Sequence, residues 1–296
     1  MSGGFGPLHA RMSEVVGYEA FFMSGSQVAA YVYGYPDVGL LGLNEMVESV
    51  RRITNVCAIP VFADADTGYG NAVNVYHTVY AYIRAGAAGL HIEDQEAPKK
   101  SGTQAGRRLI SREEAIGKYK AAVAAKKELD ADFVICARCD SIGSEGGGFE
   151  DAVERSIAYV KEAGVDAIWV NTLRTREEIA LACQRIPAPV IAPYYGARPS
   201  PTFAEFQKLG AAAVLYPSLT TANGLQATWE LLHEFKERGP GVLEEWNKKA
   251  AASPYGMVPR THDPLLPAEK ILRIEDEFIP KDLQRDYKGT FGHDRH

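Results

Sequence analysis

Short apolar runs alternate with helical patterns along most of the chain. Eight of these runs are candidate strands, and most are continuous in apolar residues rather than alternating between apolar and polar. Continuous runs are typical of parallel strands that are covered on both faces. The candidate strands are residues 6–10, 18–23, 60–65, 88–94, 132–138, 166–171, 189–193 and 212–217.

The segments between the runs begin and end as helices do. Ser111 precedes a long helical pattern and Glu114 follows three residues later, which is the spacing of a capping box. Thr175 and Glu178 repeat this arrangement, and Gly164 ends another helical pattern as a C-cap.

Strict alternation of eight strands with helices predicts a (β/α)8 barrel of the TIM type over residues 1–235. A doubly wound open sheet is the alternative, but no G-x-G-x-x-G motif follows the early strands, which weakens any dinucleotide site. Residues 236–296 are polar and interrupted by glycine and proline. We expect this C-terminal extension to pack on the barrel or on a neighbouring subunit.

Composition and charge limit the kinds of molecule that the protein is expected to bind. The chain has 296 residues, of which 46% are hydrophobic, and a net charge of −6 with scattered basic residues. This size suits one large α/β domain or two smaller ones, and the charge argues against nucleic acid or an anionic membrane as a partner. No apolar run reaches the ~18 residues of a membrane span. No signal-peptide pattern is visible, so we expect a cytoplasmic protein, with an organellar address left open.

The four cysteines do not form a paired CxxC zinc pattern. Cys136 and Cys139 are three positions apart in a candidate strand, where side chains alternate between faces. They are therefore expected to point to opposite faces, which argues against a redox pair.

Polar residues cluster where the candidate strands end. In a (β/α)8 barrel these ends surround the active-site mouth. The residues at these ends are Ser24, Gly25, Ser26, Asp64, Asp66, His91, Glu93, Asp94, Gln95, Arg138, Asp140, Asn171, Tyr194 and Tyr195.

Three carboxylates, Asp64, Asp66 and Glu93, follow adjacent strands and are expected to converge. Carboxylates in one mouth repel one another unless a cation or a proton intervenes. A set of oxygen ligands suits Mg²⁺ or Mn²⁺ rather than zinc. The alternative is that one or two of them cap the helices that follow.

The neighbouring strand ends supply groups that bind anions. Arg138 is suited to hold a carboxylate or a phosphonate, although a structural ion pair with Asp140 or Glu93 is the alternative. Residues 24–26 offer closely spaced N–H groups and hydroxyls as an oxyanion cradle, or form a plain tight turn. For His91 we expect a packed, hydrogen-bonded place inside the barrel rather than a catalytic role.

Several motifs in order resemble the isocitrate lyase/phosphoenolpyruvate mutase superfamily over about residues 8–235. They are "SGSQVAA", "GYPDVGL", "FADADTGYG", "HIEDQ", "PKKSG" and "ARCDS". The resemblance, which is nearest to methylisocitrate lyases, implies a (β/α)8 barrel whose last helix is swapped between subunits, usually in a homotetramer. It also implies Mg²⁺ and a small α-keto or α-hydroxy carboxylate as substrate.

The resemblance implies a role for each matched residue. Asp64 is the direct metal ligand, while Asp66 and Glu93 hold metal-bound waters. The substrate carboxylate and its oxyanion end are bound by Ser24, Gly25, Ser26 and Arg138. The remaining candidates are Asp37, Lys99, Ser101 and Arg138 for catalysis and Asn171 and Tyr194 for substrate binding.

The loop of residues 98–103 departs from the family pattern. The lyases carry K-K/R-C-G-H there, whereas this chain has Ser101 and Thr103 at the Cys and His positions. A thiol exchanges a proton near neutral pH far more readily than an aliphatic hydroxyl does. The lyases also place a Glu where this chain has Asn171, and the loop after the seventh strand lacks their Asn-containing pattern.

Three chemistries therefore stay open. The first is cleavage of a C–C bond in a 2-hydroxy or 2-keto (di)carboxylic acid through an enolate-type intermediate, with Ser101, Tyr194, Tyr195 or a water as proton source. The second is decarboxylation or hydrolysis of a β-keto acid such as oxaloacetate. The third is mutase or hydrolase chemistry at the C–P bond of phosphonopyruvate.

Overall fold

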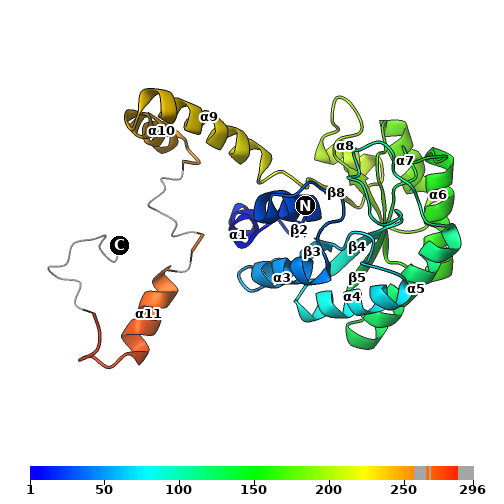
Figure 1. The fold of residues 1–296 in the computed structure, drawn as a ribbon, viewed down its shortest axis with the longest axis horizontal. Coiled ribbons are helices and arrows are strands. Elements are labelled where there is room, and N and C mark those ends of the chain that lie inside the picture. Colours follow the sequence, from blue (N-terminus) through cyan, green and yellow to red (C-terminus); the bar gives the residue numbers. More distant parts are fainter. Residues whose placement is uncertain (257–264, 267, 286–296) are drawn as a thin grey trace. The chain divides into compact units, whose positions relative to one another are not determined.

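The computed structural model describes residues 1–256, 265–266 and 268–285. The chain divides into two compact units, residues 1–227 and residues 228–296. Figure 1 shows the first unit as a central set of strands surrounded by helices.

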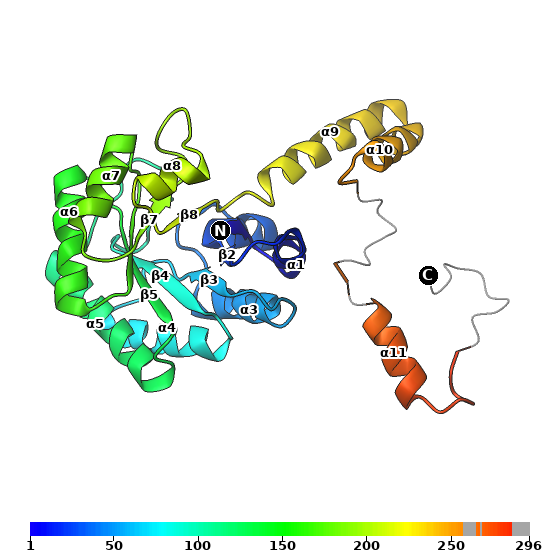
Figure 2. The same ribbon diagram turned by 180° about the vertical axis from the view of Figure 1, so that it is seen from behind.

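The first unit contains eight parallel strands that neighbour one another in sequence order. Figure 2 shows the same ring of helices outside the strands from behind. Sequential order and all-parallel pairing confirm the predicted barrel and exclude the doubly wound sheet. The strands are β1 (Ser2–Gly4), β2 (Phe21–Met23), β3 (Val61–Asp64), β4 (Gly89–Glu93), β5 (Val134–Cys139), β6 (Ala167–Val170), β7 (Val190–Pro193) and β8 (Ala213–Leu215).

The two ends of the sheet meet just beyond β8. Ser2 forms an isolated parallel bridge with Tyr216, and the Tyr216 N–H donates to the carbonyl of Met1 at 3.1 Å. A Cβ built on Gly3 would lie 2.7 Å from the backbone of Tyr216 and Pro217. This seam therefore requires glycine, because any side chain would force the two segments apart.

The prediction of a strand at residues 6–10 is wrong. These residues begin helix α1 (Pro7–Val16), and the first strand lies earlier, at Ser2–Gly4. Pro7 occupies the start of the helix, where its missing N–H has no intrahelical partner to lose. The glycine-rich strand gave no propensity signal, since Gly is depleted in strands.

Helices follow the strands as predicted, and their caps are those read from the sequence. The Ser111 hydroxyl accepts from the Glu114 N–H at 3.1 Å, and the Thr175 hydroxyl accepts from the Glu178 N–H at 3.1 Å. Gly164 has a left-handed φ of 75°. The helices are α2 (Gly25–Val28), α3 (Leu43–Thr54), α4 (Ala72–Arg84), α5 (Arg112–Leu129), α6 (Phe149–Ala158), α7 (Arg176–Arg185), α8 (Phe203–Lys208) and α9 (Ala222–Arg238), with π-helical turns at Ala29–Tyr33 and Tyr159–Ala163.

Two apolar clusters hold the barrel together. The larger fills the space between the strands and the helices. The smaller, which includes Phe22, Phe62 and Trp169, is separate from it and contains Cys136, whereas Cys139 belongs to the larger cluster. The two cysteines thus point to opposite faces of β5, as predicted.

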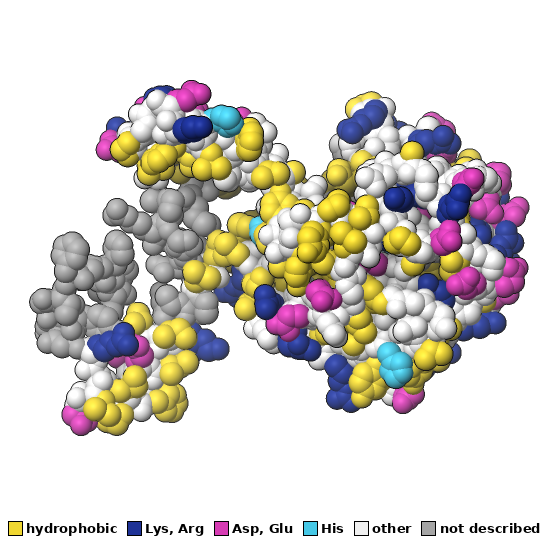
Figure 3. Space-filling model, viewed as in Figure 1, with side chains coloured by type: hydrophobic (Ala, Val, Ile, Leu, Met, Phe, Trp, Pro, Cys, Tyr) yellow, Lys and Arg dark blue, Asp and Glu magenta, His cyan; other side chains and the backbone are white. Residues whose placement is uncertain are grey.

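The second unit is helical. It contains the end of α9, then α10 (Gly241–Ala252) and α11 (Ala268–Phe278). Figure 3 shows hydrophobic side chains gathered along α9, and Trp229, Leu232 and Phe235 there are exposed. The unit begins at residue 228, eight residues before the predicted boundary. Residues 257–264, 267 and 286–296 of the predicted extension lie outside the described residues.

Within the described part of the chain, no helix is both long enough and apolar enough to cross a bilayer.

We predict that Gly3→Ala weakens the seam between β1 and the segment after β8. The added methyl group meets backbone atoms at 2.7 Å, so we expect the free energy of unfolding to fall by about 1–3 kcal/mol. Gly117→Ala is the matched control, because Gly117 lies inside α5 and, apart from its own stretch of helix, nothing lies within 4 Å of its built Cβ. The free energy of unfolding of the control should stay unchanged or rise by about 1 kcal/mol. Equal urea midpoints for the two variants would contradict the close approach.

Candidate active site

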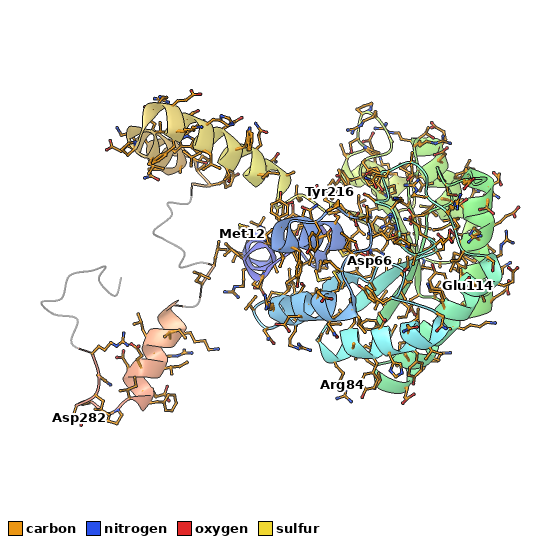
Figure 4. The ribbon with its side chains drawn as sticks, viewed as in Figure 1. Met12, Asp66, Arg84, Glu114, Tyr216 and Asp282 are labelled. Atoms are coloured by element: carbon orange, nitrogen blue, oxygen red, sulfur yellow. The ribbon has the colours of Figure 1, made fainter. Side chains whose placement is uncertain are left out.

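A cavity of about 350 Å³ opens among the carboxyl ends of the strands. Nine of the predicted site residues line it: Ser24, Ser26, Asp37, Asp64, Lys99, Ser101, Arg138, Tyr194 and Tyr195. A larger hollow of about 710 Å³ lies beside Lys100, Arg108 and Glu145, and Gln95 is the one residue of the predicted mouth that lines it. The smaller cavity is therefore the candidate site. Asp66, which contacts Lys99 of the cavity wall, is labelled inside the ring of helices in Figure 4.

Strand register decides which side chains meet in the mouth. Asp64 pairs with His91 across β3 and β4. Glu93 pairs with Arg138 across β4 and β5, and Arg138 pairs with Trp169 across β5 and β6. Residues in register on adjacent strands place their side chains on the same face. These groups therefore lie next to one another inside the barrel.

Asp64 is held by two backbone N–H groups. Its Oδ2 accepts the Gly25 N–H and its Oδ1 accepts the Asp66 N–H, both at 3.0 Å. Burial raises the pKa of Asp64, but nearby His91, Lys99 and Arg138 outweigh burial and leave the pKa below its usual value. Asp64 therefore stays ionised at neutral pH.

Gly25 allows the backbone to approach this carboxylate. A Cβ at residue 25 would lie 2.8 Å from Asp64 Oδ2. Because the Gly25 N–H already serves Asp64, that amide is not available to the predicted cradle, whose side-chain donors are the hydroxyls of Ser24 and Ser26. These hydroxyls lie 3.0 Å apart and both residues line the cavity.

Lys99 neutralises two of the acids from the loop above the mouth. Its Nζ lies 2.8 Å from Asp66 Oδ1 and also contacts Asp37. Burial lowers the pKa of Lys99, but the charges of Asp66, Glu93, Asp64 and Asp37 raise it well above the usual value. Lys99 is therefore an ammonium group and not a base at neutral pH.

The carboxyl of Asp66 has a pKa that is raised toward neutral pH. Burial raises its pKa to about 6, with Lys99 opposing the shift and Asp64 adding to it. Its backbone has a left-handed φ of 45°, which is uncommon for a residue other than glycine.

Arg138 is held in an ion-pair network, as the structural alternative predicted. Its Nε lies 2.8 Å from Asp140 Oδ2 and its Nη1 lies 3.1 Å from Glu93 Oε2. Its guanidinium also lies 4.8 Å from the centre of the Trp169 ring. Among the described residues neither Glu93 oxygen accepts a hydrogen bond, and burial raises the pKa of Glu93 well above its usual value.

The loop of residues 98–103 closes one side of the cavity. Gln95 binds both the N–H and the carbonyl of Lys100, each at 3.0 Å. Ser101 and Thr103 line the cavity, and their hydroxyl oxygens lie 3.4 Å apart. Within the described residues, Thr103 is the one side-chain hydrogen-bond partner of Ser101, so no base adjoins its hydroxyl.

Asn171 and Tyr195 form a contact that the sequence did not indicate. The Tyr195 hydroxyl donates to Asn171 Oδ1, and Asn171 Nδ2 donates to Asp140 Oδ1 at 2.5 Å. Asn171 thus lies behind the cavity wall and touches the partner of Arg138. Strand-end position was the signal for each residue, but nothing in the sequence showed their mutual contact.

His91 is packed as predicted, but the predicted hydrogen bond is wrong for the described residues. Its ring is fully buried 4.8 Å from the Trp169 ring, and neither ring nitrogen has a hydrogen-bond partner there. The nearest polar group is Asp64 Oδ1, 3.4 Å from Nε2. Burial lowers the pKa of His91 to about 4.

Comparison with known proteins gives consistent matches. A family profile described as phosphoenolpyruvate phosphomutase matches residues 4–236. The 2-methylisocitrate lyase of Aeropyrum pernix is 40% identical over 239 residues, which cover 80% of this chain and 75% of that protein. The 2,3-dimethylmalate lyase of Eubacterium barkeri is 40% identical over 246 residues, which cover 82% and 83% of the two chains.

A solved structure extends the likeness to three dimensions. It is a phosphonopyruvate hydrolase in complex with oxalate and Mg²⁺, with a TM-score of 0.80 and 31% sequence identity. The alignment covers 94% of this chain and 93% of the other.

The depressed pKa of His91 predicts a loss of stability in acid. The unfolded chain takes up a proton near pH 6.5, whereas the folded chain does so near pH 4. Lowering the pH from 7 to 4.5 therefore favours unfolding by about 2–3 kcal/mol from this group. Between pH 7 and pH 4.5 we expect His91→Gln to lose about 2–3 kcal/mol less stability than the wild-type protein loses. The free energy of unfolding is measured with urea in the presence of EDTA. Parallel pH profiles of the two proteins would refute the assignment.

Proposed function

The chain belongs to the phosphoenolpyruvate mutase/isocitrate lyase superfamily, and on this premise we propose that it is a Mg²⁺-dependent carbon–carbon lyase. The proposed substrate is a small 2-hydroxy or 2-keto (di)carboxylic acid, cleaved through an enolate-type intermediate. The 2-methylisocitrate lyase and the 2,3-dimethylmalate lyase, both 40% identical to this chain, support this class of reaction.

The observation that carries the proposal is a set of three buried carboxylates at the strand ends, of which Asp64 lines the cavity, Asp66 contacts Lys99 and Glu93 contacts Arg138. Asp64, Asp66 and Glu93 are each at most 7% exposed. Their oxygens suit a hard divalent cation. Among the described residues no three acidic, His or Cys side chains are placed to ligate one ion together. We propose that the set binds Mg²⁺ or Mn²⁺ that keeps several waters, with Asp64 as the direct ligand and Asp66 and Glu93 holding its waters.

When bound, Mg²⁺ supplies positive charge that stabilises the oxyanion developing on the substrate. The other tasks fall to side chains. The Ser24 and Ser26 hydroxyls donate to the same oxyanion or to the carboxylate, and Arg138 holds the carboxylate. Tyr194 completes the substrate-binding wall, Asn171 lies behind that wall and contacts Tyr195 and Asp140, and Asp37 and Lys99 form a charged pair in the wall.

The proton that the enolate carbon takes up has three sources in the cavity. Ser101 lines the cavity, but among the described residues no base adjoins its hydroxyl. Burial raises the pKa of Tyr195 to about 12, so Tyr195 is protonated at neutral pH and can donate but not accept. Tyr194, which lines the cavity, or a water is the third source. We propose that the proton comes from Ser101, Tyr194, Tyr195 or a water.

Hydrolysis or decarboxylation of a β-keto acid such as oxaloacetate is the second candidate. It is favoured by one observation: Ser101 contacts the Thr103 hydroxyl rather than a base. Cleavage of a β-keto acid needs stabilisation of the enolate but less help from an acid in the loop. Chemistry at a C–P bond is the third candidate, supported by the likeness to phosphonopyruvate hydrolase.

The assembly and its location also belong to the proposal. We propose a cytoplasmic homotetramer in which the C-terminal extension is exchanged between subunits. The exposed apolar side chains Trp229, Leu232 and Phe235 support a partner surface on α9.

A substrate panel separates the three chemistries. Purified enzyme with Mg²⁺ is given 2-hydroxy and 2-keto diacids, oxaloacetate and phosphonopyruvate in turn, and the products are identified by mass. A lyase releases a keto acid or aldehyde together with pyruvate or a related acid. A decarboxylase releases CO₂, a hydrolase releases acetate with oxalate, and a C–P enzyme releases phosphate or rearranges the phosphorus group. Turnover that is undiminished in EDTA would exclude the proposed metal dependence.

Asp64→Asn is predicted to abolish Mg²⁺-dependent turnover while the barrel stays folded. The amide keeps the size of the side chain but removes the charge that would bind the cation. We expect kcat/KM to fall about 1,000-fold or more and Mn²⁺ binding, followed by electron paramagnetic resonance, to be lost. Asp132→Asn at an exposed position is the control and should bind Mn²⁺ normally. Normal Mn²⁺ binding by Asp64→Asn would remove Asp64 from the metal site.

Replacement of Ser101 tests the departure from the family loop. A thiol at this position exchanges protons more readily than a hydroxyl, so Ser101→Cys should raise kcat toward C–C lyase substrates. Ser101→Ala should lower kcat if the hydroxyl supplies the proton. Unchanged rates and an unchanged substrate profile for both variants would show that Ser101 takes no part in proton transfer.

A further inference from the structure

Arg107 is a buried cation for which the proposed function has no use. The residue is 3% exposed, whereas the side chain of its neighbour Arg108 is 68% exposed and pairs with Glu145. Among the described residues no carboxylate forms an ion pair with Arg107. Burial of a guanidinium without a carboxylate is costly, so its contacts with other groups must account for its position.

Those contacts are backbone carbonyls of two different loops. Arg107 Nη1 donates to the carbonyl of Gly102 in the loop that covers the cavity. Arg107 Nη2 donates to the carbonyl of Ile142, just after β5, at 2.5 Å. The Arg107 backbone is also fixed, because its carbonyl accepts the Glu145 N–H at 3.0 Å. The side chain therefore joins the covering loop to a segment anchored on the barrel.

The Gly102 carbonyl accepts a second side chain on its other side. Asn171 Nδ2 donates to it at 3.1 Å, and the same nitrogen donates to Asp140, the partner of Arg138. Two charged or amide donors on one loop carbonyl hold that peptide more firmly than an ordinary loop contact does. The carbonyl is thus clamped between Arg107 and the wall of the cavity.

Two glycines make room for the clamp. A Cβ at Gly102 would lie 2.3 Å from Arg138 Nη2 and 2.6 Å from Asn171 Nδ2. A Cβ at Gly143, whose φ is 87°, would lie 2.6 Å from Arg107 Nη2. Both approaches exclude any larger residue without a shift of the loop or of the arginine.

We propose that Arg107 is a positioning residue that clamps the Gly102 carbonyl and so holds Ser101 and Thr103 against the cavity. Ser101 and Thr103 flank Gly102 in the chain and both line the cavity. A fixed carbonyl at Gly102 therefore sets where their hydroxyls lie. The effect on turnover rests on the proposed function, whereas the effect on the loop does not.

Arg107→Met tests the clamp, with Arg108→Met as the matched control at the next position. Methionine keeps an unbranched side chain but removes every donor. We expect amide hydrogen exchange of residues 98–106 to be about tenfold faster in Arg107→Met, and exchange of the strands to be unchanged. We also expect kcat to fall about 100-fold, since misplacement by about an ångström has effects of that size, with little change in KM or in Mn²⁺ binding. Arg107→Lys can reach one carbonyl but not both, so it should recover part of kcat.

Three outcomes would overturn the proposal. One is loop exchange in Arg107→Met that equals exchange in Arg108→Met. Another is faster exchange throughout the barrel with a matching fall in thermal stability, which would make Arg107 a general structural residue. The third is normal kcat despite a loosened loop, which would separate the clamp from catalysis. If the wild-type enzyme turns over no substrate of the panel, the proposed function fails, but the exchange measurement still decides whether Arg107 holds the loop.

Discussion

Charge balance inside the barrel mouth is the constraint on which the site depends. Asp64, Asp66, Glu93 and Asp140 are buried within a few ångströms of two cations, Lys99 and Arg138. Each cation is shared, because Lys99 contacts Asp66 and Asp37, and Arg138 contacts Glu93 and Asp140. Burial favours the neutral form of Asp64, Asp66 and Glu93, and the charges of nearby cations oppose it. Asp64 therefore stays ionised, whereas the pKa of Asp66 rises to about 6.

The same balance explains why a divalent cation suits this place. The acids are more numerous than the cations, and neither oxygen of Glu93 accepts a hydrogen bond from the described residues. A hard cation with its waters would supply the missing positive charge and the missing donors together. The chemistry of the superfamily needs charge stabilisation at this point, because an oxyanion grows on the substrate as a neighbouring bond breaks.

Close backbone approach is the second condition that the site imposes. Gly25 brings its N–H to Asp64, and Gly102 brings its carbonyl to Asn171 and Arg107. Gly3 allows the first strand to meet the segment after the last one. In each case a single methyl group would collide with backbone or charged atoms, so the barrel seam, the acid and the loop depend on positions without a side chain. The loop is thereby held in place although Ser101 itself makes little contact.

The sequence by itself determined the barrel and the composition of its mouth. Seven of the eight predicted strands lie where the structure has strands, because continuous apolar runs and helix caps are local signals. The positions of the acids at the ends of β3 and β4 could then be predicted, because the carboxyl ends of parallel strands lie on the same side of the barrel.

The first strand was missed because a glycine-rich segment carries no apolar pattern. Its need for glycine comes from Tyr216 and Pro217, more than 200 residues away. Only the tertiary structure decided that Arg107 is buried while Arg108 is exposed, that Asn171 meets Tyr195, and that Lys99 neutralises Asp66. These contacts join separate strand ends and loops, and their distances and charges exist only once the barrel has closed.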